Sequence, residues 1–417
     1  MYRRRRAAAP SRFRHHGDVK ERVDTVVIGA GIVGLATARE TLLRDARADV
    51  VVVDKEDMVG AHQTSHNSGV IHSGVYYAPG SAKAELCVSG ARAMLRFCED
   101  HAVPVRMDGK LIVAVDEGEL GPLAELERRA TANGVPDLRR LGRGEIAEVE
   151  PHAHGVAALH VPGTAVTDFA AVARALADDV VARGGRIQLS FPVSSVTGDD
   201  DGVTVKTDDG RHIGARKGIA CAGLQSDRVA GYPADVRILP FRGSYYALGP
   251  RAAPLVRSMI YPVPDPRFPF LGTHFTRHFD DTVSCGPNAI LALAREEYSR
   301  WSFSAADTWD SLRFPGSWRL ARKHWSTGVR ELADELSKRR SLRSARRYLP
   351  DLEEGDLAND DALGIRAQAV DRGGNLMGDF VLRRTGPLLH VLNAPSPAAT
   401  ASLAIAERIV DRISAPE

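Results

Sequence analysis

Apolar residues in the first part of the chain form two short runs separated by one longer segment. Residues 25–28 and 50–53 are continuous apolar runs of strand length, while residues 35–44 are rich in Ala and Leu. Short apolar runs are typical of buried strands, and the longer segment is typical of a helix. We therefore predict a strand–helix–strand unit at the start of an α/β domain.

The remaining pattern predicts helices and strands along the whole chain. Helices are expected at residues 81–101, 117–133, 168–183 and 403–413, with Asp168 placed to cap the third of them. Strands are expected at residues 110–115, 186–189, 203–207, 218–223, 238–248, 283–293, 363–367 and 388–392. The strand at 218–223 ends in glycine, as strands that return to a nucleotide-binding fold often do. The first unit is therefore expected to be interrupted by a second layer of strands.

A glycine motif follows the first predicted strand. Gly29, Gly31 and Gly34 have the spacing G-x-G-x-x-G, and Asp54 ends the second predicted strand. Gly29 allows the tight turn, Gly31 lets the backbone approach a pyrophosphate, and Gly34 lets the helix pack closely on the strand. The helix N-terminus faces the phosphate charge, and Asp54 can accept hydrogen bonds from a ribose. The motif predicts a dinucleotide site without distinguishing FAD from NAD.

The segment after this motif has an unusual composition. Residues 60–77, GAHQTSHNSGVIHSGVYY, combine three histidines and two tyrosines with glycine and small hydroxyl residues. Gly, Ser and Asn favour turns, so the segment is a poor helix and a poor strand. A loop that wraps a flat cofactor and then faces a substrate accounts for the rings. Cofactor contact is expected to give way to substrate contact within residues 69–77.

Composition and charge narrow the classes of function. The chain has 417 residues, enough for two domains, and is 44% hydrophobic and 26% charged. Its net charge of +2 implies no global attraction to nucleic acid, and its four scattered cysteines show no metal spacing, so no metal is expected. A reducing cytoplasm is the expected location. Residues 1–21 are predicted to be a disordered basic tail, with an anchor to anionic lipid as the alternative.

Residues 301–348 differ from the rest of the chain. They contain all four tryptophans, and residues 313–347 carry eleven Lys and Arg against three acids. We predict a helical cap whose aromatic residues are core and whose charges are solvated. The alternative is a basic, tryptophan-bearing surface that docks on a membrane or on a redox partner.

The chain from about residue 24 to residue 413 resembles the L-2-hydroxyglutarate oxidase/dehydrogenase family, in the D-amino-acid-oxidase-like group of FAD enzymes. The resemblance is carried by GAGIVG with Asp54, HQTSHNSGVIHSGVYYAPGSAKAELCVSG, CAGLQSD, PFRGSYY, PDPRFPFLGTHFTR, GPNAILALAREEY, FPGSWRLARKHWSTG, GIRAQAVDRGGNL and HVLNAPSPAATASLAI.

The resemblance implies a two-domain α/β (α+β) flavoprotein. A Rossmann-like FAD-binding domain would comprise residues 22–95, 160–230 and 361–417. A substrate domain would comprise residues 96–159 and 231–360, with an antiparallel or mixed sheet and the helical region 301–348 as a cap. FAD would lie extended, with its adenine near Asp54 and its isoalloxazine near residues 65–72. Its predicted contacts are Gly29, Gly31, Ile32, Val33, Gly34, Asp54, Lys55, Thr64, Ser65, His66, Asn67, Ser68, Gly69, Val70, Val193, Ala222, Gly223, Arg366, Asn393, Pro395, Ser396, Pro397, Ala398, Ala399 and Thr400.

The implied reaction is oxidation of an L-2-hydroxy acid, L-2-hydroxyglutarate above all, with hydride passing to flavin N5. A planar arginine can hold a carboxylate through two hydrogen bonds, and Arg366 is the first candidate, with Arg242 second. Histidine suits proton abstraction near neutrality, and both His72 and His274 are candidates. Tyr245 is expected to bond the substrate or close the pocket. Oxygen or a quinone is the expected electron acceptor, and contact of residues 301–347 with the inner face of a membrane is the alternative to a solvated helical cap.

One departure from the family pattern leaves the substrate open. The family usually has an acid where this chain has Ser244, in the expected substrate wall. Loss of a buried polar partner can change selectivity by about 10⁴. The alternative substrate is therefore a larger hydroxy acid, a sugar alcohol or an amine. A flavin-binding protein without turnover is the alternative of a different class.

Overall fold

The computed structural model describes residues 22–264, 272–286, 290–299 and 302–415, without the side chains of 327, 330–332, 336 and 359–362. The predicted basic tail, residues 1–21, lies outside the described residues. The predicted strand–helix–strand unit is confirmed as β1 (Arg22–Ile28), α1 (Ile32–Arg44) and β2 (Val50–Val53). The strands β1 and β2 are parallel.

The first sheet has eight strands and a parallel centre. Strands β12 (His212–Ala220), β1, β2 and β9 (Arg186–Gln188) lie side by side in parallel, and β20 (Leu388–Asn393) runs parallel to the end of β12. Strands β10 (Val193–Asp199), β11 (Gly202–Thr207) and β19 (Val381–Thr385) are antiparallel additions. All residues of β2 and β20 are buried, as expected for strands with both faces covered.

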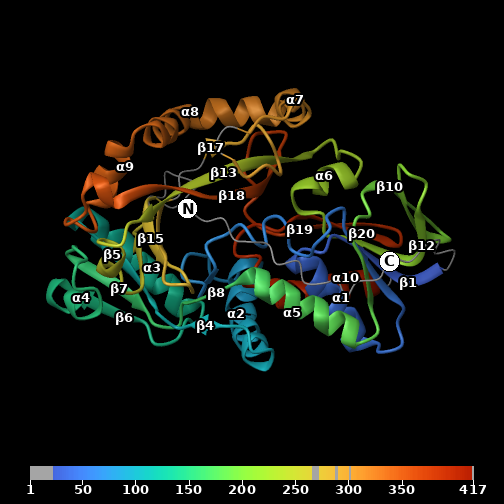
Figure 1. Cartoon of the computed structure of the whole chain (residues 1–417), viewed down its shortest axis with the longest axis horizontal. Helices are drawn as coiled ribbons and strands as arrows, with labels where there is room; N and C mark the ends of the chain where they lie inside the picture. The colour runs from blue at the N-terminus through green and yellow to red at the C-terminus, as the bar shows by residue number, and fades with distance from the viewer. Residues whose placement is uncertain (1–21, 265–271, 287–289, 300–301, 416–417) are drawn as a thin grey trace.

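Helices cover this sheet and form the largest apolar core. Helix α1 packs against α5 (Phe169–Ala182) and α10 (Ser402–Ser414), and α2 (Ala82–Asp100) packs against α10. The predicted cap of α5 is confirmed, since the Asp168 carboxylate accepts a hydrogen bond from the Ala170 amide. Figure 1 shows α1, α5 and α10 grouped below the sheet.

The second sheet has nine strands and is mixed. Along its path lie β17 (Ile290–Leu291), β13 (Val236–Leu248), β16 (Val283–Gly286), β15 (His274–Arg277), β14 (Met259–Pro262), β5 (Lys110–Ala114), β7 (Ala157–Val161) and β6 (Arg139–Gly142). The long strand β18 (Leu357–Asp371) pairs with β13 in antiparallel register. The domain boundaries stay a prediction, and β18 belongs to the second sheet over its whole length, including residues beyond 361.

Helices and short elements complete the second layer. Helices α3 (Leu120–Ala132) and α4 (Arg143–Val149) pack on the β5–β7 end. A small sheet of β3 (Val70–Ile71), β8 (Ala165–Thr167) and β4 (Val105–Arg106) lies between the two large sheets in Figure 1. Short turns of helix are α6 (Ser226–Val229), η1 (Glu117–Glu119), η2 (Gly223–Gln225), η3 (Ala253–Leu255) and η4 (Glu354–Asp356).

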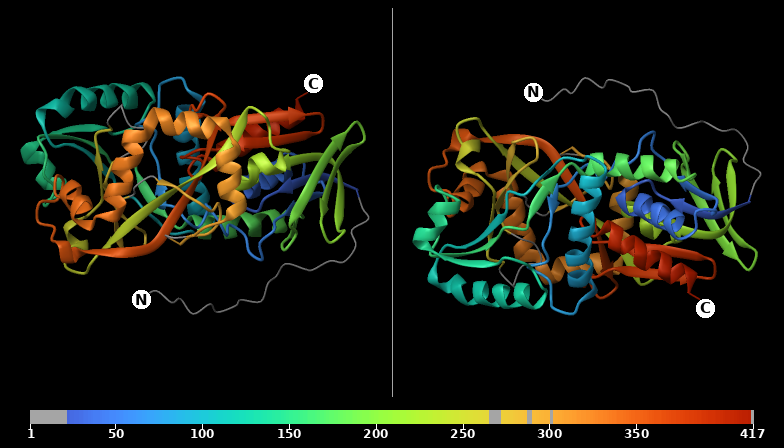
Figure 2. Two further views of the ribbon diagram at one scale, coloured as in Figure 1. Left: turned by 90° about the horizontal axis from the view of Figure 1, so that it is seen from above. Right: turned by 90° about the horizontal axis from the view of Figure 1, so that it is seen from below.

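The predicted helical cap is formed by α7 (Ala305–Arg313), α8 (Pro315–Leu336) and α9 (Lys338–Ala345). These helices arch over β13 and β18, as the two further views also show (Figure 2). Helix α8 is kinked at His324, whose φ and ψ of −121° and 22° are not helical. The predicted fold class is confirmed: an α/β architecture with a parallel sheet, a second mixed sheet and a helical cap.

Candidate active site

One cavity of about 980 Å³ extends from the glycine motif to the second sheet. Its walls come from the β1–α1 turn, residues 60–77, strands β13 and β18, and the loop at residues 393–400. Cavities of this size between two layers are typical of cofactor sites. Elements that lie far apart along the chain therefore line the same cavity.

The three glycines of the motif are required for different reasons. A Cβ on Gly29, which has φ of +108°, would lie 2.4 Å from the carbonyl oxygen of Cys221, and one on Gly34 would lie 1.9 Å from the Gly29 carbonyl oxygen. These two glycines therefore serve the packing of the chain itself. A Cβ on Gly31 would meet only Thr64 Oγ1, at an ordinary 3.5 Å. The space beside Gly31 faces the cavity, which fits a ligand phosphate approaching the backbone there.

The end of β2 fits the ribose side of a dinucleotide. The Asp54 carboxylate accepts hydrogen bonds from the amides of Ala30, at 2.6 Å, and Glu56, at 2.9 Å. Burial raises the pKa of Asp54, and these two backbone bonds oppose that shift. Each carboxylate oxygen has a second lone pair, so both oxygens can still accept from a ligand hydroxyl.

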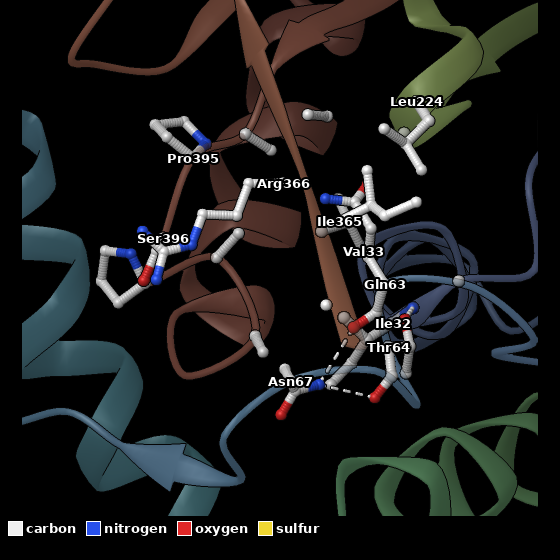
Figure 3. Close-up of a pocket in the computed structure, with 18 of the residues that line it drawn as sticks. Ile32, Val33, Gln63, Thr64, Asn67, Leu224, Ile365, Arg366, Pro395 and Ser396 are labelled. Carbon is white, nitrogen blue, oxygen red and sulfur yellow. Dashed lines mark hydrogen bonds between the residues drawn. The ribbon is translucent and has the colours of Figure 1, made fainter. Parts of the chain in front are cut away.

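The first part of the loop at residues 60–77 is held by its own hydrogen bonds. Thr64 Oγ1 accepts from the Ile32 amide at 3.0 Å, which ties the loop to the start of α1. The Asn67 amide group donates to the carbonyl oxygens of Gln63 and Thr64, as Figure 3 shows, and the Ser65 hydroxyl donates to a carbonyl within the loop. The predicted cofactor wall is therefore preformed in this structure.

The ring of His66 is covered on one face. It stacks on Tyr298 with centroids 3.7 Å apart, and its Nδ1 donates to the His62 carbonyl oxygen at 2.9 Å. Burial lowers the pKa of His66, so its imidazole is neutral at pH 7. A neutral, stacked ring with a fixed tautomer is a rigid part of the cavity wall.

The loop at residues 393–400 closes the opposite side of the cavity. Asn393 Nδ2 donates to the carbonyl oxygens of Met377 and Asp379, at 3.0 and 2.8 Å. Thr400 Oγ1 accepts from the His72 amide at 3.1 Å and therefore ties this loop to the histidine-bearing loop. Helix α10 begins directly afterwards, at residue 402, so its unpaired amides lie beside the loop.

The far end of the cavity carries two neutral histidines. His274 on β15 is 5% exposed, and its Nδ1 donates to the Gly272 carbonyl oxygen at 2.9 Å, which leaves Nε2 as an acceptor. Burial lowers its pKa to about 4. His72 has a pKa of about 3, lowered by burial and then by the nearby charge of Lys110. His72 Nδ1 is buried without a hydrogen-bond partner among the described residues.

Arg366 enters the cavity from β18. Figure 3 shows its side chain leaving the strand and pointing toward the loop of Pro395 and Ser396, while Ile32 and Thr64 lie on the other side of the strand. Arg366 faces Phe241 in the register of β13 and β18. Opposed residues share a face of a sheet, so Arg366 and the cavity-lining Gly243 and Tyr245 point the same way.

The same register explains the position of Arg242. Arg242 is opposite Ile365, so its side chain leaves the face of β13 opposite to that of Phe241 and Gly243. Its Nη2 lies 3.3 Å from Oε1 of Glu335 on α8, and the Ser244 hydroxyl donates to the same oxygen at 3.0 Å. Arg242 is not among the cavity-lining residues of the described chain. Its role as a second carboxylate contact stays a prediction from the sequence.

Two lysines at this end of the cavity were not predicted from the sequence. Lys83 on α2 lines the cavity, and Lys110 on β5 lies behind its wall, with Nζ 4.7 Å from the ring centroid of Tyr76 and 5.2 Å from that of Tyr261. Burial lowers the pKa of both, that of Lys110 to about 8. Lysine inside an otherwise apolar strand and at the start of a helix was the signal in the sequence that could have indicated them.

Most predicted site residues lie around the cavity. Those that line it are Gly29, Gly31, Ile32, Val33, Asp54, Lys55, Thr64, His66, Asn67, Ser68, Val70, His72, Val193, Ala222, Gly223, Tyr245, His274, Arg366, Asn393, Pro395, Ser396, Pro397, Ala398, Ala399 and Thr400. Within the described chain, Gly34, Ser65, Gly69 and Arg242 do not line it. Gly69, with φ of +71°, has no room for a Cβ, which would lie 2.7 Å from the Thr167 carbonyl oxygen.

Comparison with known proteins gives consistent relatives. The profile of the DAO family, described as FAD dependent oxidoreductase, matches residues 24–412. The chain is 44% identical to L-2-hydroxyglutarate dehydrogenase, mitochondrial, of Caenorhabditis elegans, over 93% of this chain and 92% of that protein. It is 42% identical to L-2-hydroxyglutarate dehydrogenase of Indibacter alkaliphilus, over 91% and 96%. The human mitochondrial protein of that name is 41% identical, over 94% and 88%.

Solved structures share the fold at low sequence identity. An L-alpha-glycerophosphate oxidase from Mycoplasma pneumoniae with FAD bound has a TM-score of 0.76 at 21% identity and covers 95% of this chain and 96% of its own. Glycine oxidase from Geobacillus kaustophilus has a TM-score of 0.68 at 18% identity, with 95% of both chains covered. The predicted cofactor, FAD, is confirmed by the family match. The chain belongs to the DAO family of FAD-dependent oxidoreductases and, within it, to the L-2-hydroxyglutarate dehydrogenase family predicted from its sequence.

Proposed function

We propose that this protein oxidises L-2-hydroxyglutarate to 2-oxoglutarate. The observation that carries the proposal is a single cavity that joins the dinucleotide-binding turn to an end with Arg366 and two neutral histidines. The names of its relatives support the substrate. FAD, when bound, supplies the acceptor for the hydride that leaves the carbinol carbon.

Arg366 would bind the carboxylate beside the carbon that is oxidised. Its planar guanidinium can donate two parallel hydrogen bonds, which fixes the orientation of the substrate as well as its position. Each hydrogen bond to a charged group contributes about 1.5–3 kcal/mol. Tyr245, which lines the cavity from the strand opposite Arg366, would contact the same end of the substrate.

A histidine would accept the hydroxyl proton of the substrate. Only the neutral imidazole can do so, and the depressed pKa values of His72 and His274 keep both rings neutral at pH 7. His274 offers Nε2, because its Nδ1–H is engaged with a backbone carbonyl. His72 offers a buried nitrogen without a described partner. Both remain candidates.

The remaining cavity walls would hold the cofactor. Asp54 would accept from a ribose hydroxyl, and the amides beside Gly31 would meet the pyrophosphate. The amides at the start of α10, beside residues 395–400, would stabilise negative charge on the flavin ring.

Anaerobic mixing tests the proposed reaction. L-2-hydroxyglutarate is expected to bleach the flavin absorbance, and its D-enantiomer is expected to leave the spectrum unchanged. Arg366→Lys, which keeps the charge but loses the planar fork, is expected to slow bleaching by about 10²-fold. Bleaching by the D-enantiomer, an amino acid or a polyol instead would contradict the proposal. A flavin that none of these compounds reduces would support the class of flavin proteins without turnover.

The electron acceptor and its location form a second proposal. We propose that oxygen or a quinone reoxidises the flavin, and that the α7–α8 surface contacts the inner face of a membrane. Trp309, Trp318 and Trp325 are about 60–70% exposed there, among many Arg and Lys residues, a combination that suits the headgroup region of anionic lipid. Within the described residues, none of the helices combines the length and apolar character needed to cross a bilayer.

Flotation with anionic liposomes tests this surface. The protein is expected to float with vesicles that contain phosphatidylglycerol and to stay behind with neutral vesicles. The double variant Trp318→Ser, Trp325→Ser should lose flotation while retaining substrate bleaching, because both side chains point away from the core. Flotation that the double variant retains would contradict the proposal.

A further inference from the structure

Lys83 occupies an unfavourable place for a cation. It lies in the first turn of α2, next to the Ser81 cap, and it lines the substrate end of the cavity. The N-terminus of a helix carries partial positive charge, so a lysine there is repelled. Burial adds a second cost and is the main reason that its pKa is lowered. A lysine at this position despite both unfavourable effects indicates that its charge binds a ligand.

The ammonium group has hydrogen-bonding capacity to spare. Lys83 Nζ donates to the Gly378 carbonyl oxygen at 3.2 Å and lies 5.1 Å from the centroid of the Tyr77 ring. Of its three N–H donors, this carbonyl uses one. No carboxylate of the described chain forms an ion pair with it, and Asp379 acts on it only at longer range. Two donors therefore remain for a ligand in the cavity.

Lys83 and Arg366 present two positive charges to one cavity from different elements. Arg366 comes from β18 and Lys83 from α2, and each feels the charge of the other, which contributes to the lowered pKa of Lys83. Repulsion between two cations is relieved by a ligand with two negative charges, and it is relieved less by a ligand with one.

We propose that Lys83 binds the second carboxylate of the substrate, the one remote from the carbon that is oxidised, while Arg366 binds the first. The inference rests on the proposed function, because it takes a dicarboxylic 2-hydroxy acid as the substrate. Lys83 is then the residue that separates dicarboxylates from monocarboxylates of the same length, and the tyrosine beside it shields the ion pair from water.

Lys110 is the matched control for this assignment. Lys110 is 1% exposed, its ammonium lies near two tyrosine rings, and the residue is not among those that line the cavity in the described chain. Lys110→Met removes a nearby positive charge without removing a donor from the cavity. Lys83→Met removes both. A difference between the two variants separates direct binding from a general electrostatic field.

The test uses glutarate and valerate, five-carbon acids without the reacting hydroxyl. Titration of the holoenzyme, followed by the flavin absorbance, gives Kd for both acids, with FAD content and melting temperature measured for every variant. Wild type is expected to bind glutarate about 10- to 100-fold more tightly than valerate, the range for one charge-assisted contact. Lys83→Met should abolish that preference, Lys83→Arg should retain part of it, and Lys110→Met should retain most of it.

Two outcomes overturn the assignment. One is a preference for glutarate that Lys83→Met leaves unchanged, as it would if both acids were weakened equally, and the other is a wild type without preference for glutarate. Bleaching of wild type by L-2-hydroxyglutarate is measured in parallel. If bleaching occurs and the preference does not depend on Lys83, the assignment of Lys83 fails alone. If bleaching does not occur, the proposed function fails.

Discussion

Two basic side chains of this protein are equally buried and have opposite surroundings. Arg295 and Lys110 are each 1% exposed. Arg295 forms two hydrogen bonds to the buried carboxylate of Asp227, at 2.5 and 3.0 Å, and a third to the Leu224 carbonyl oxygen. Lys110 has tyrosine rings as its described neighbours and no carboxylate partner in the described chain.

The difference distinguishes Arg295, whose charge stabilises the fold through an ion pair, from Lys110, whose charge lies near the cavity. The Arg295–Asp227 pair joins the segment after β17 to the turn before β13, and the Asp227 carboxylate also accepts from the Ile238 amide. The buried charge of Arg295 is therefore paired with a buried carboxylate, while its Nε has no hydrogen-bond partner among the described residues. At the substrate end, Lys83 lines the cavity and forms no ion pair with a carboxylate of the described chain, so an anionic ligand is left to compensate its charge.

The largest expected effect comes from breaking the compensated pair. Asp227→Ala leaves the charge of Arg295 buried without its carboxylate partner. Removal of one member of a buried ion pair lowers the free energy of unfolding by about 3–5 kcal/mol. Lys110→Met replaces an uncompensated charge by an apolar chain of similar length, so no loss of stability is expected. Urea unfolding of both variants and wild type measures this contrast. Equal destabilisation by the two changes would mean that Lys110 is as fully compensated as Arg295.

A pH-dependent effect of about half that size is expected at His274. Its pKa falls from the ordinary 6.5 to about 4 on folding, because burial disfavours the charged ring. Above pH 6.5 this difference in pKa does not affect stability, because the ring is neutral in both states. Below pH 6.5 the unfolded state binds the proton first, so the folded state loses stability as the pH falls toward 4. At pH 5 the loss is about 2 kcal/mol, since each pKa unit corresponds to 1.36 kcal/mol.

Comparison with His274→Gln isolates this contribution. Glutamine is polar and similar in size to histidine, and it does not titrate. Between pH 7.5 and pH 5, wild type should lose about 2 kcal/mol more unfolding free energy than the variant. Lys110→Met should reduce the loss, because the charge of Lys110 helps to lower the pKa of His274. Identical pH profiles of wild type and His274→Gln would contradict a neutral, buried His274.

The sequence predicted those parts of the site that depend on local backbone requirements. The glycine spacing, Asp54 and the small-residue loop after β20 are readable because close backbone approach restricts the residue types. The position of Arg242 was not readable, because the face it leaves depends on the register of β13 with β18, and a shift of one residue reverses it. The positions of Lys83 and Lys110 at the site could not be predicted, because they depend on α2 and β5 meeting at the same end of the cavity in the folded chain.

The smallest expected effect concerns Arg242, whose carboxylate partner, Glu335, lies on α8 of the helical cap. The Ser244 hydroxyl donates to Glu335 Oε1 at 3.0 Å, and Arg242 Nη2 lies 3.3 Å from the same oxygen. Glu335→Ala removes the acceptor that Arg242 and Ser244 share and should cost about 1.5 kcal/mol, the lower end of the range for hydrogen bonds to a charged group, since Arg242 has a further interaction.

Adding Ser244→Asp to Glu335→Ala should recover most of this loss, because residues 242 and 244 leave the same face of β13 and a new carboxylate then lies beside the guanidinium. Ser244→Asp alone should be destabilising, because it places a second negative charge next to buried Glu335. Urea unfolding of the two single variants and the double variant forms a cycle that measures their coupling. Additive effects would show that the carboxylates at positions 335 and 244 act independently. That result would contradict the view that either carboxylate can serve as the partner of Arg242.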